Sequence, residues 1–508
     1  MSRMTRYTIL IAIIAAVMGL SACEQLVQLL SDGDSAAMDN RMPQLTGVSG
    51  EIPIGLVSPL TGRFNSSYGP PLNQGFELAL EEINNAQLGD ARMKFIVADD
   101  RSTPEGAVEA YQKLIDEYNV PVIFGPTTSD QAEAAFPIAQ QNQVVAFSSS
   151  SNRVGLSALG DYLFRAGLTT EKIIPPGIRA SHAILGYNQV AIFYDESDTY
   201  SIDSNERFRD TLSQLGVTVL LTETFKGDEF ERSHQIDFSA SLNRIMTMKP
   251  DAIFVAAQQP DLTEIQIQSR KLGISSEVPF ITSLISDLAN AGDAAEGSIS
   301  FAGWIATADT PGNQDFVDKY RATYGSEPNA WTAQSYAAVY LVAEAIARAQ
   351  STDPSAIRAA LADIRDYDTV LGKFSFDDVG DAVYAPIVNI VKYGKFEVLG
   401  DDDSVDTTAH IIDDLPVQKV SAAILESFPV QVNLEVEGYL ADSCTMLHET
   451  TVQREGNTIH VQITTIRPRE SACATVITEI QPTVSLGSFD PGSYQANVNG
   501  TIVEFEVQ

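Results

Sequence analysis

Strand and helix signals alternate from residue 51 to about residue 400, and this alternation is the strongest constraint on the fold. Each strand signal is a short apolar run that a longer segment with helical periodicity follows. The apolar runs occupy residues 52–57, 95–98, 120–124, 144–147, 190–193, 252–256 and 279–281. A chain that repeats strand and helix in this way forms parallel sheets covered by helices on both faces. We therefore predict an α/β architecture for this region.

Ligands bind to such sheets beyond the carboxyl ends of the strands, where helix N-termini present free N–H groups. Two predicted turns at such positions are rich in hydrogen-bond donors. One ends in Thr128 and Ser129, and the other contains Ser150 and Asn152. Backbone N–H groups together with hydroxyls form a carboxylate cradle without formal positive charge. Helix capping selects the same residue types, so each turn alone fits either role.

Composition excludes several classes of function. The chain has 67 acidic and 32 basic residues and a formal net charge of −35, which argues against nucleic-acid binding because phosphates require a cationic surface. The three cysteines and five histidines show no zinc-ligand spacing. The common hydrolase, metalloprotease, nucleotide and dinucleotide motifs are missing from the sequence. We expect neither an enzyme nor a bound metal or cofactor.

The first residues have the pattern of an export signal. Arg3 and Arg6 precede an apolar run at residues 7–20, which is short for a bilayer span and leads into Ser21-Ala22-Cys23. The pattern resembles a bacterial lipoprotein signal. The resemblance implies cleavage after residues 1–22, acylation of the Cys23 sulfur, and a mature protein anchored by lipid outside the cytoplasm, in the periplasm or on the outer face. The alternative is an uncleaved N-terminal anchor.

Residues 23–50 form a polar segment without a sustained period, and we interpret them as a lipid-anchored flexible linker. As a flexible coil, the 27 residues after Cys23 would span about 30 Å in root-mean-square length. That length would hold the next domain clear of the membrane surface.

Ordered motifs along residues 51–398 point to a known family. These motifs are Ser58-Pro59-Leu60-Thr61-Gly62, Gly75-Phe76-Glu77-Leu78-Ala79, Glu81-Glu82-Ile83-Asn84, Asp99-Asp100-Arg101-Ser102, Gly125-Pro126, Phe164-Arg165 and Ala291-Gly292-Asp293-Ala294-Ala295-Glu296-Gly297. The region resembles the periplasmic leucine/isoleucine/valine-binding protein family. The resemblance implies a type I periplasmic-binding fold with two α/β lobes, which close on a small solute and present it to an ABC permease.

The resemblance also suggests where the lobes and the ligand lie. Lobe I would comprise about residues 51–168 and 298–370, and lobe II about residues 169–297 and 371–400. Ser129 resembles the family serine that holds the ligand carboxylate. The other implied ligand contacts are Thr128 beside Ser129, Ser150 and Asn152 in the next turn, and Tyr68 and Tyr200, which would close over the ligand from a loop of lobe I and from lobe II. Either tyrosine could instead serve packing.

Three positions depart from the family pattern. Amino-acid binders of the family usually carry an acidic residue after the strand at residues 279–281, and this chain has Leu284 there. Asp287 could substitute, although it also fits as a helix cap. Asn152 replaces a threonine, and Gln258 replaces an aromatic residue. Because a buried ammonium without a partner is costly, we expect leucine and valine to bind weakly, and neutral or amide-bearing carboxylates to bind better.

The pattern changes after residue 400. Asp401 begins a solvated junction at residues 401–428, without the spacing of a calcium-binding EF-hand. In residues 429–508 apolar and polar side chains alternate, and Asn499-Gly500 indicates a hairpin. We predict a small antiparallel β domain resembling a sandwich, with His448 and His460 on its surface.

The predicted β domain contains Cys444 and Cys473. Lipidation would consume Cys23, so these two cysteines remain, and an oxidising exterior favours joining them. We predict a disulfide between them.

Three functions fit these features. The first is a transport receptor that captures an amino acid, an amide or a small carboxylate for an ABC permease. The second is a sensory receptor that signals lobe closure to a membrane partner. The third is a surface scaffold or adhesion lipoprotein that uses the β domain. Only the first two require a closing pocket.

Overall fold

The structure is a computed structural model. It describes residues 43, 45, 47–86, 89–227, 236–284, 288–400, 410–425, 430–442, 444–469, 473, 475–489 and 491–507. The predicted signal peptide, Cys23 and Asp287 lie outside the described residues. Leu45 belongs to the predicted linker, yet its side chain is 3% exposed and packs into the core of the next domain.

The first lobe is built on a five-stranded sheet whose neighbouring strands are all parallel, in the order β2-β1-β3-β4-β5. Its strands are β1 (Ser49–Ser58), β2 (Asp90–Asp99), β3 (Val122–Phe124), β4 (Val145–Ser148) and β5 (Leu163–Arg165). Its helices are α2 (Asn65–Asn85), α3 (Pro104–Tyr118), α4 (Ser129–Asn142), α11 (Asn313–Tyr324), α12 (Ala330–Ala349) and α13 (Pro354–Ala362). Thr103 caps α3 through its hydroxyl, which accepts the Gly106 N–H, and Pro104 occupies the first helical position, as the sequence predicts.

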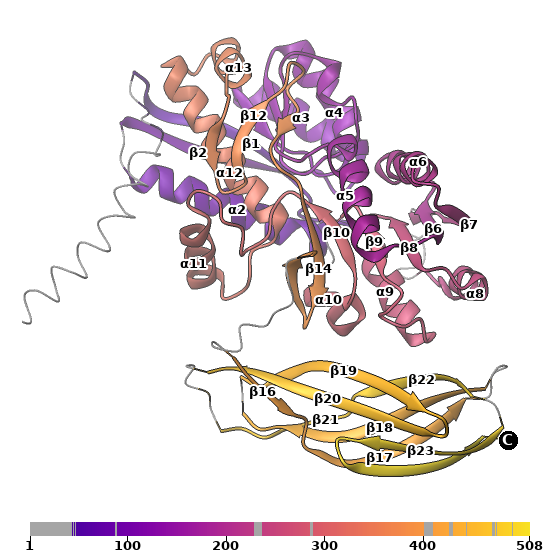
Figure 1. Ribbon diagram of the computed structural model, residues 1–508. Coiled ribbons are helices and arrows are strands. Elements are labelled where there is room, and N and C mark those ends of the chain that lie inside the picture. The colour runs from indigo at the N-terminus through magenta and orange to yellow at the C-terminus, as the bar shows by residue number, and fades with distance from the viewer. Residues whose placement is uncertain are drawn as a thin grey trace, which may run out of the picture.

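The second lobe contains a seven-stranded sheet in the order β15-β14-β10-β9-β8-β6-β7. Its strands are β6 (Gln189–Asp195), β7 (Thr218–Phe225), β8 (Ala252–Ala256), β9 (Phe280–Thr282), β10 (Ile299–Ala302), β14 (Ile387–Lys392) and β15 (Lys395–Val398). Its helices are α5 (Thr170–Leu185), α6 (Thr199–Gln214), α8 (Ser239–Met248), α9 (Asp261–Lys271) and α10 (Leu288–Ala291). β14 and β15 are antiparallel additions at one edge. The two lobes lie side by side in Figure 1.

The chain crosses between the lobes later than the sequence suggested. β10 pairs with β9 in the second sheet, so the second crossing follows residue 302, not residue 297. The small sheet of β11 (Tyr367–Thr369), β12 (Gly372–Phe376) and β13 (Ala382–Val383) comes before the third crossing. In β12, the ring of Phe376 packs 5.0 Å from that of Phe164, so residues 371–383 belong with the first lobe. An apolar run does not reveal which sheet it joins.

The C-terminal region forms two β-sheets that enclose their own apolar core. One sheet contains β16 (His410–Asp414), β19 (Met446–Glu455), β20 (Thr458–Pro468), β23 (Gly492–Val498) and β24 (Thr501–Val507); the other contains β17 (Val417–Leu425), β18 (Val430–Leu440), β21 (Thr478–Ile480) and β22 (Thr483–Phe489). The sandwich therefore begins near residue 410, inside the predicted junction. The sequence pattern did not reveal β16 and β17, because apolar and polar residues do not alternate strictly in these strands. Most pairs are antiparallel, but β20 and β23 are parallel.

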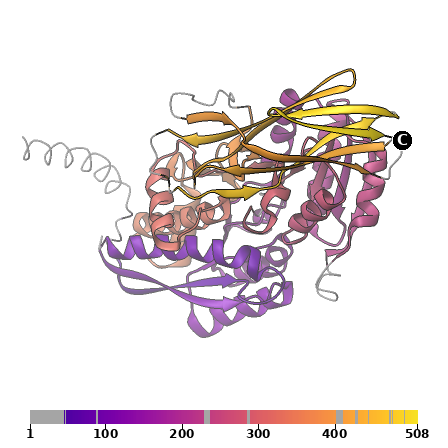
Figure 2. The same ribbon diagram turned by 90° about the horizontal axis from the view of Figure 1, so that it is seen from below.

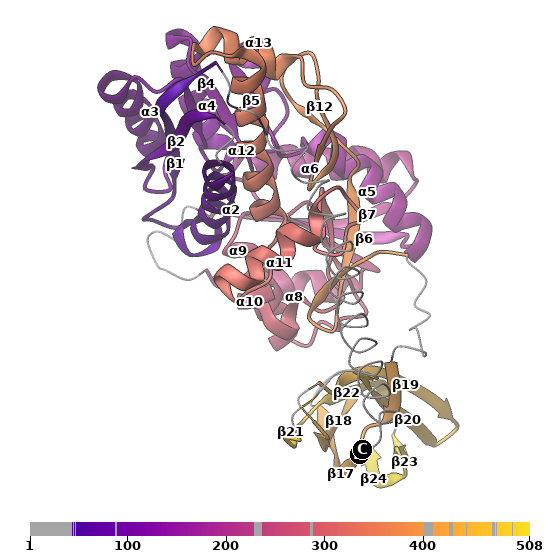
Figure 3. The ribbon, with the colours of Figure 1, turned by 90° about the vertical axis from the view of Figure 1, so that its left-hand side faces the viewer.

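Two local features of the sandwich match the sequence. Asn499 and Gly500 form the two-residue turn between β23 and β24, with φ angles of 45° and 90°. Cys444 and Cys473 are joined by a disulfide with a Cα–Cα distance of 5.6 Å. Figures 1 and 3 place the sandwich below the two-lobed region, and Figure 2 shows it from below, in front of that region.

Candidate functional site

A narrow cavity of about 10 Å³ lies between the lobes, where strand ends of both sheets face each other. Its wall contains residues that follow β3 and β4 in the first lobe and β8 and β9 in the second. The lining residues are Tyr68, Thr127, Thr128, Ser129, Ser150, Ser151, Asn152, Tyr200, Gln258, Leu284 and Trp331. Seven of the eight ligand contacts predicted from the sequence are therefore in one place. The eighth, Asp287, is outside the described residues.

The first turn of α4 forms one wall of this cavity. N–H groups in the first turn of a helix lack intrahelical acceptors, so those at Ser129 and Asp130 carry the positive end of the helix dipole. Thr128 has a structural role as well, because its N–H donates to Gln131 Oε1 at 3.0 Å. The Ser129 Oγ accepts the Arg153 N–H at 3.2 Å, which leaves its O–H to donate elsewhere. The predicted cap is thus present, and the role of this turn as a carboxylate cradle stays a prediction.

The turn after β4 supplies a second set of hydroxyls. Ser150 Oγ donates to the carbonyl of Thr127 at 2.8 Å and so ties the two turns together. Ser151 Oγ is different, because it is buried and has no hydrogen-bond partner among the described residues, although Ser151 lines the cavity. A buried hydroxyl without a partner costs about 1 to 3 kcal/mol. A polar ligand in the cavity would remove that cost.

Buried Arg165 holds this turn in place from behind. Its guanidinium donates to the carbonyls of Ser151 and Arg153 at 3.3 and 2.6 Å. The same group pairs with Asp381 at 2.5 Å, next to the third crossing. Arg165 therefore connects the turn after β4 to the segment next to the third crossing between the lobes.

Asn152 contacts the first crossing between the lobes as well as the cavity. The side-chain Nδ2 of Asn152 donates to the Leu168 carbonyl at 2.6 Å, and the backbone carbonyl of Asn152 accepts the Thr170 N–H at 2.9 Å. Leu168 and Thr170 belong to the first crossing. The side-chain amide nitrogen is thus engaged with the backbone, and Oδ1 is the atom of this side chain with room for a ligand donor.

Tyr200 and Gln258 line the cavity from the second lobe. Tyr200 is in the first turn of α6, is 1% exposed, and its hydroxyl is 2.5 Å from Ser283 Oγ. Gln258 follows β8, and its Nε2 donates to Asp198 Oδ1 at 3.4 Å. Both side chains are held by neighbours in their own lobe.

The lobes are also joined directly across the cavity. Tyr68 Oη donates to Gln258 Oε1 at 2.6 Å, and Thr199 Oγ1 donates to Asp130 Oδ1 at 2.5 Å. Arg63 of the first lobe pairs with Asp261 of the second. Tyr68 does not lie in a loop, as the sequence suggested, but in the first turn of α2. The helix aims its hydroxyl at the opposite lobe.

Burial changes the acid–base behaviour of the acids around this interface. The pKa of Asp198 is raised to about 7, mainly by burial and further by the nearby Asp130 carboxylate. The pKa of Asp261 is also raised to about 7 by burial, although Arg63 opposes the shift. Burial raises the pKa of the Tyr68 and Tyr200 hydroxyls above the usual value, so both stay protonated.

A second cavity of about 30 Å³ adjoins the first one. The two share Asn152, Leu284 and Trp331. The other residues of the second wall are Leu168, Ile173, Ser283, Phe301, Ala302, Gly303, Ala330 and Gln334. Leu284 thus stands at the border between the two cavities.

Sequence reasoning missed Trp331, which lies in the first turn of α12. Its ring packs 4.6 Å from that of Tyr68, measured between centroids. The available signal was Asn329, a typical N-cap just before an aromatic residue, which predicts the helix start but not its proximity to the turns of another segment. Thr127 and Ser151 belong to the predicted turns but were not singled out as contacts.

Comparison with known proteins identifies the two-lobed region. Residues 51–387, more than half of the chain, match the family model of the periplasmic binding protein. The chain belongs to the periplasmic binding protein family. Residues 434–507 of this periplasmic binding protein match a second model, the ORF11 beta-sandwich domain.

Relatives of this periplasmic binding protein bear names of amino-acid binders. The Leu/Ile/Val-binding protein homolog 1 of Brucella suis is 26% identical over 65% of this chain and 87% of its own. A leucine-binding protein LivK from Thermotoga maritima has 26% identity and a TM-score of 0.62, over 68% of this chain and 97% of its own. LivJ from Streptococcus pneumoniae, solved with isoleucine, has 25% identity and a TM-score of 0.63, over 69% and 98%.

These relatives are solute-binding proteins and not enzymes, and the chain shares their solute-binding role. The two-lobed architecture that the family resemblance implied is confirmed, with parallel strands at the core of each sheet. Within the described residues, no helix has both the length and the apolar character needed to cross a membrane.

Proposed function

We propose that this protein is an extracytoplasmic, lipid-anchored receptor that captures a small polar solute between its lobes and delivers it to an ABC permease. The solute is an amino acid, an amide or a small carboxylate, and Cys23 carries the lipid. The Ser151 hydroxyl, which has no hydrogen-bond partner among the described residues, lines the same cavity as the first turn of α4 and supports the proposal, since together they could bind a hydrogen-bond acceptor.

The contacts between the lobes support capture by closure. Tyr68, Gln258 and Trp331 line the cavity, and Tyr68 also bonds across the interface. A solute that contacts both walls would bind the closed form more tightly than the open form. Its binding energy would then shift the population towards closure, which a permease could recognise.

A thermal-shift screen of amino acids, amides and small carboxylates tests capture, because a ligand that binds only the folded state raises the melting temperature. At a concentration 100 times its dissociation constant, a ligand adds about 2.7 kcal/mol. We expect at least one compound of these classes to stabilise the two-lobed region. No stabilisation by any of them would contradict the proposal.

Uptake of the compound found in that screen tests delivery. In the source bacterium, deleting the gene should abolish high-affinity uptake, and the parent gene should restore it. A Cys23→Ser variant should be released from the membrane and restore uptake poorly. Unimpaired uptake in the deletion strain would favour the sensory alternative.

A further inference from the structure

A buried ion pair joins the two lobes outside the cavities. Arg63, just before α2 in the first lobe, pairs with Asp261, the first residue of α9 in the second lobe. The two side chains are 9% and 2% exposed, and neither residue lines either cavity. Because the partners belong to different lobes, separating the lobes would break the pair and return both charges to water.

The backbone at Gly227 covers this ion pair. Gly227 lies two residues after β7, and a Cβ atom at this position would be 2.6 Å from Arg63 Nη2 and 2.8 Å from Asp261 Oδ2. Only a residue without a side chain allows so close an approach. The Arg63 guanidinium also stands 5.2 Å from the centre of the Phe64 ring. Both charges are therefore enclosed by protein while the lobes are closed.

The second lobe is acidic where it receives Arg63. Burial raises the pKa of Asp261 to about 7, with Arg63 opposing the shift and the Asp195 carboxylate adding to it. Asp195 Oδ1 accepts the N–H groups of Ser197 and Gly227 at 2.9 and 3.0 Å, so this acid is held within the second lobe. Arg63 thus brings a positive charge from the first lobe to two acids of the second.

The closed lobes leave little empty space between them. The two cavities, of about 10 and 30 Å³, have room for about one and about two water molecules. Closing over a larger void would forfeit packing contacts. The lobes therefore pack well against each other before a solute arrives, and a solute of more than a few atoms enters only after they separate.

We propose that Arg63 and Asp261 form a latch, which holds the lobes closed before a solute binds and must release before a solute enters. The two are positioning residues, because neither contacts the cavities. An arginine keeps its charge, so the lobes can close over Arg63 only when a carboxylate faces it. The inference rests on the proposed capture of a solute between the lobes and adds what controls their movement.

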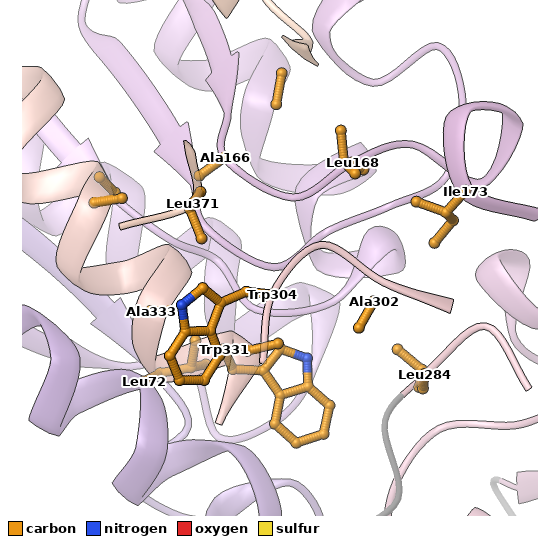
Figure 4. Close-up of a cluster of buried hydrophobic side chains, with 14 of the residues drawn as sticks. Leu72, Ala166, Leu168, Ile173, Leu284, Ala302, Trp304, Trp331, Ala333 and Leu371 are labelled. Atoms are coloured by element: carbon orange, nitrogen blue, oxygen red, sulfur yellow. The ribbon is translucent and has the colours of Figure 1, made fainter. Parts of the chain in front are cut away.

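Acrylamide quenching of tryptophan fluorescence measures opening without any solute. Trp331 is 5% exposed, and Figure 4 shows its ring between Leu72 of the first lobe and Leu284 of the second. Separating the lobes takes Leu284 away and exposes the ring to the quencher. The chain has two tryptophans, so the purified full chain with Trp304→Phe gives the signal of Trp331 alone. Measurement at pH 8 keeps Asp261 ionised.

Three variants in this background test the latch. Asp261→Asn should raise the quenching constant at least about twofold, because the closed form would bury the Arg63 charge without this carboxylate. Arg63→Met should raise it as well, since it leaves the Asp261 carboxylate buried without the guanidinium. The double variant should return towards the quenching constant of the parent, because neither charge remains to be buried. The radius of gyration from small-angle X-ray scattering should follow the same order.

Glu223→Gln is the matched control. It removes a carboxylate that faces Arg244 within the second lobe, and so should change neither the quenching constant nor the radius of gyration. Circular dichroism and the melting temperature show whether each variant is folded.

Parental quenching in a folded Asp261→Asn or Arg63→Met protein would overturn the latch. A double variant quenched at least as strongly as either single variant would also overturn it, because the two charges would then not act as a pair. Either result leaves solute capture standing, since the thermal-shift screen tests capture by itself.

Discussion

Tyr68 and Gln258 lie in different lobes and are joined by a hydrogen bond of 2.6 Å from Tyr68 Oη to Gln258 Oε1. Both residues line the cavity between the lobes, and the ring of Tyr68 also packs against Trp331. The contact that closes the protein is therefore made by the same side chains that would surround a solute. If the lobes close on a solute as proposed, closure and binding would be coupled through these residues.

Replacing Tyr68 with Phe should weaken solute binding by about ten- to a hundredfold. The variant leaves Gln258 Oε1 buried without its partner in the closed form, at a cost of about 1 to 3 kcal/mol. Calorimetry with the tightest solute measures the effect. Tyr324→Phe is the control, because that hydroxyl donates to the Gln74 carbonyl at 3.3 Å within the first lobe. Equal affinities of the parent and Tyr68→Phe would show that this bond does not support closure.

Ser129→Ala and Ser151→Ala should each weaken a carboxylate ligand by about ten- to a hundredfold, since each removes one donor from a closed cavity. Ser151→Ala should in addition leave the stability of the unliganded protein unchanged or slightly higher, because its hydroxyl has no partner among the described residues. Ser375→Ala is the control; Ser375 Oγ accepts the Asp366 N–H at 2.9 Å, away from the cavity. If both cradle variants bind as tightly as the parent, the cradle is misassigned.

Asn152→Ala should weaken binding for a different reason. It removes the bond from Nδ2 to the Leu168 carbonyl, and so loosens the first crossing as well as the cavity wall. We therefore expect Asn152→Ala to lower both the solute affinity and the melting temperature, whereas Ser129→Ala mainly lowers affinity. Calorimetry and thermal unfolding of the two variants distinguish these roles. An Asn152→Ala protein with the melting temperature of the parent would show that the hydrogen bond from Asn152 to Leu168 does not stabilise the first crossing.

The melting temperature should depend on the protonation of Asp198. Its pKa is about 7 in the folded protein, above the unfolded value near 4, so the folded state holds a proton that the unfolded state has lost. That difference removes stability as pH rises from about 4 to 7. Asp198→Asn keeps a capping oxygen for the Ser201 N–H but cannot ionise.

The Asp198→Asn protein should melt at least about 3 °C above the parent at pH 8, and the difference should vanish near pH 4. Differential scanning calorimetry between pH 4 and 8 measures both curves. Asp353→Asn is a suitable control, because Asp353 is an exposed N-cap whose pKa is lowered by its hydrogen bonds. If the melting temperatures of the parent and of Asp198→Asn change with pH in parallel, the raised pKa of Asp198 is wrong.

Removing the disulfide should destabilise the β-sandwich without affecting the solute site. Cys444 and Cys473 are 29 residues apart, and closing a loop of that length contributes about 3 to 4 kcal/mol by chain entropy. The double variant Cys444→Ser/Cys473→Ser should lower the melting transition of the sandwich and leave solute affinity unchanged. Two reactive thiols in mature protein purified without reductant would rule out the bond.

The alternation of strands and helices was sufficient to predict parallel sheets covered by helices, because local periodicity determines the type of each element, whereas the two lobes were implied by the family resemblance. It did not place the crossings. The run at Ile299–Ala302 is buried on all sides, and its partner β9 is chosen by tertiary packing that the sequence does not display. The sequence pattern also failed to reveal β16 and β17, the first two strands of the sandwich. In Val417–Leu425 the apolar residues do not alternate strictly, so the segment resembled a junction.

The candidate site was predictable where its residues follow strands. Ser129 begins the helix after β3 and Ser150 lies in the turn after β4, and the carboxyl ends of parallel strands meet at one edge of a sheet. Trp331 comes from a distant helix start, and its approach to Tyr68 depends on how α12 packs against α2. The second cavity was not predictable at all, since its residues are contributed by segments from residue 152 to residue 334.

Intrinsic fluorescence reports whether a small solute binds between the lobes. The chain has two tryptophans, and only Trp331 lines the cavities; Trp304 is buried with its Nε1 donating to Asn313 Oδ1 at 2.6 Å. Titration with a bound carboxylate should change the emission saturably in the parent and in Trp304→Phe, but not in Trp331→Phe. Calorimetric binding to the parent with no emission change that depends on Trp331 would place the solute elsewhere and contradict the account.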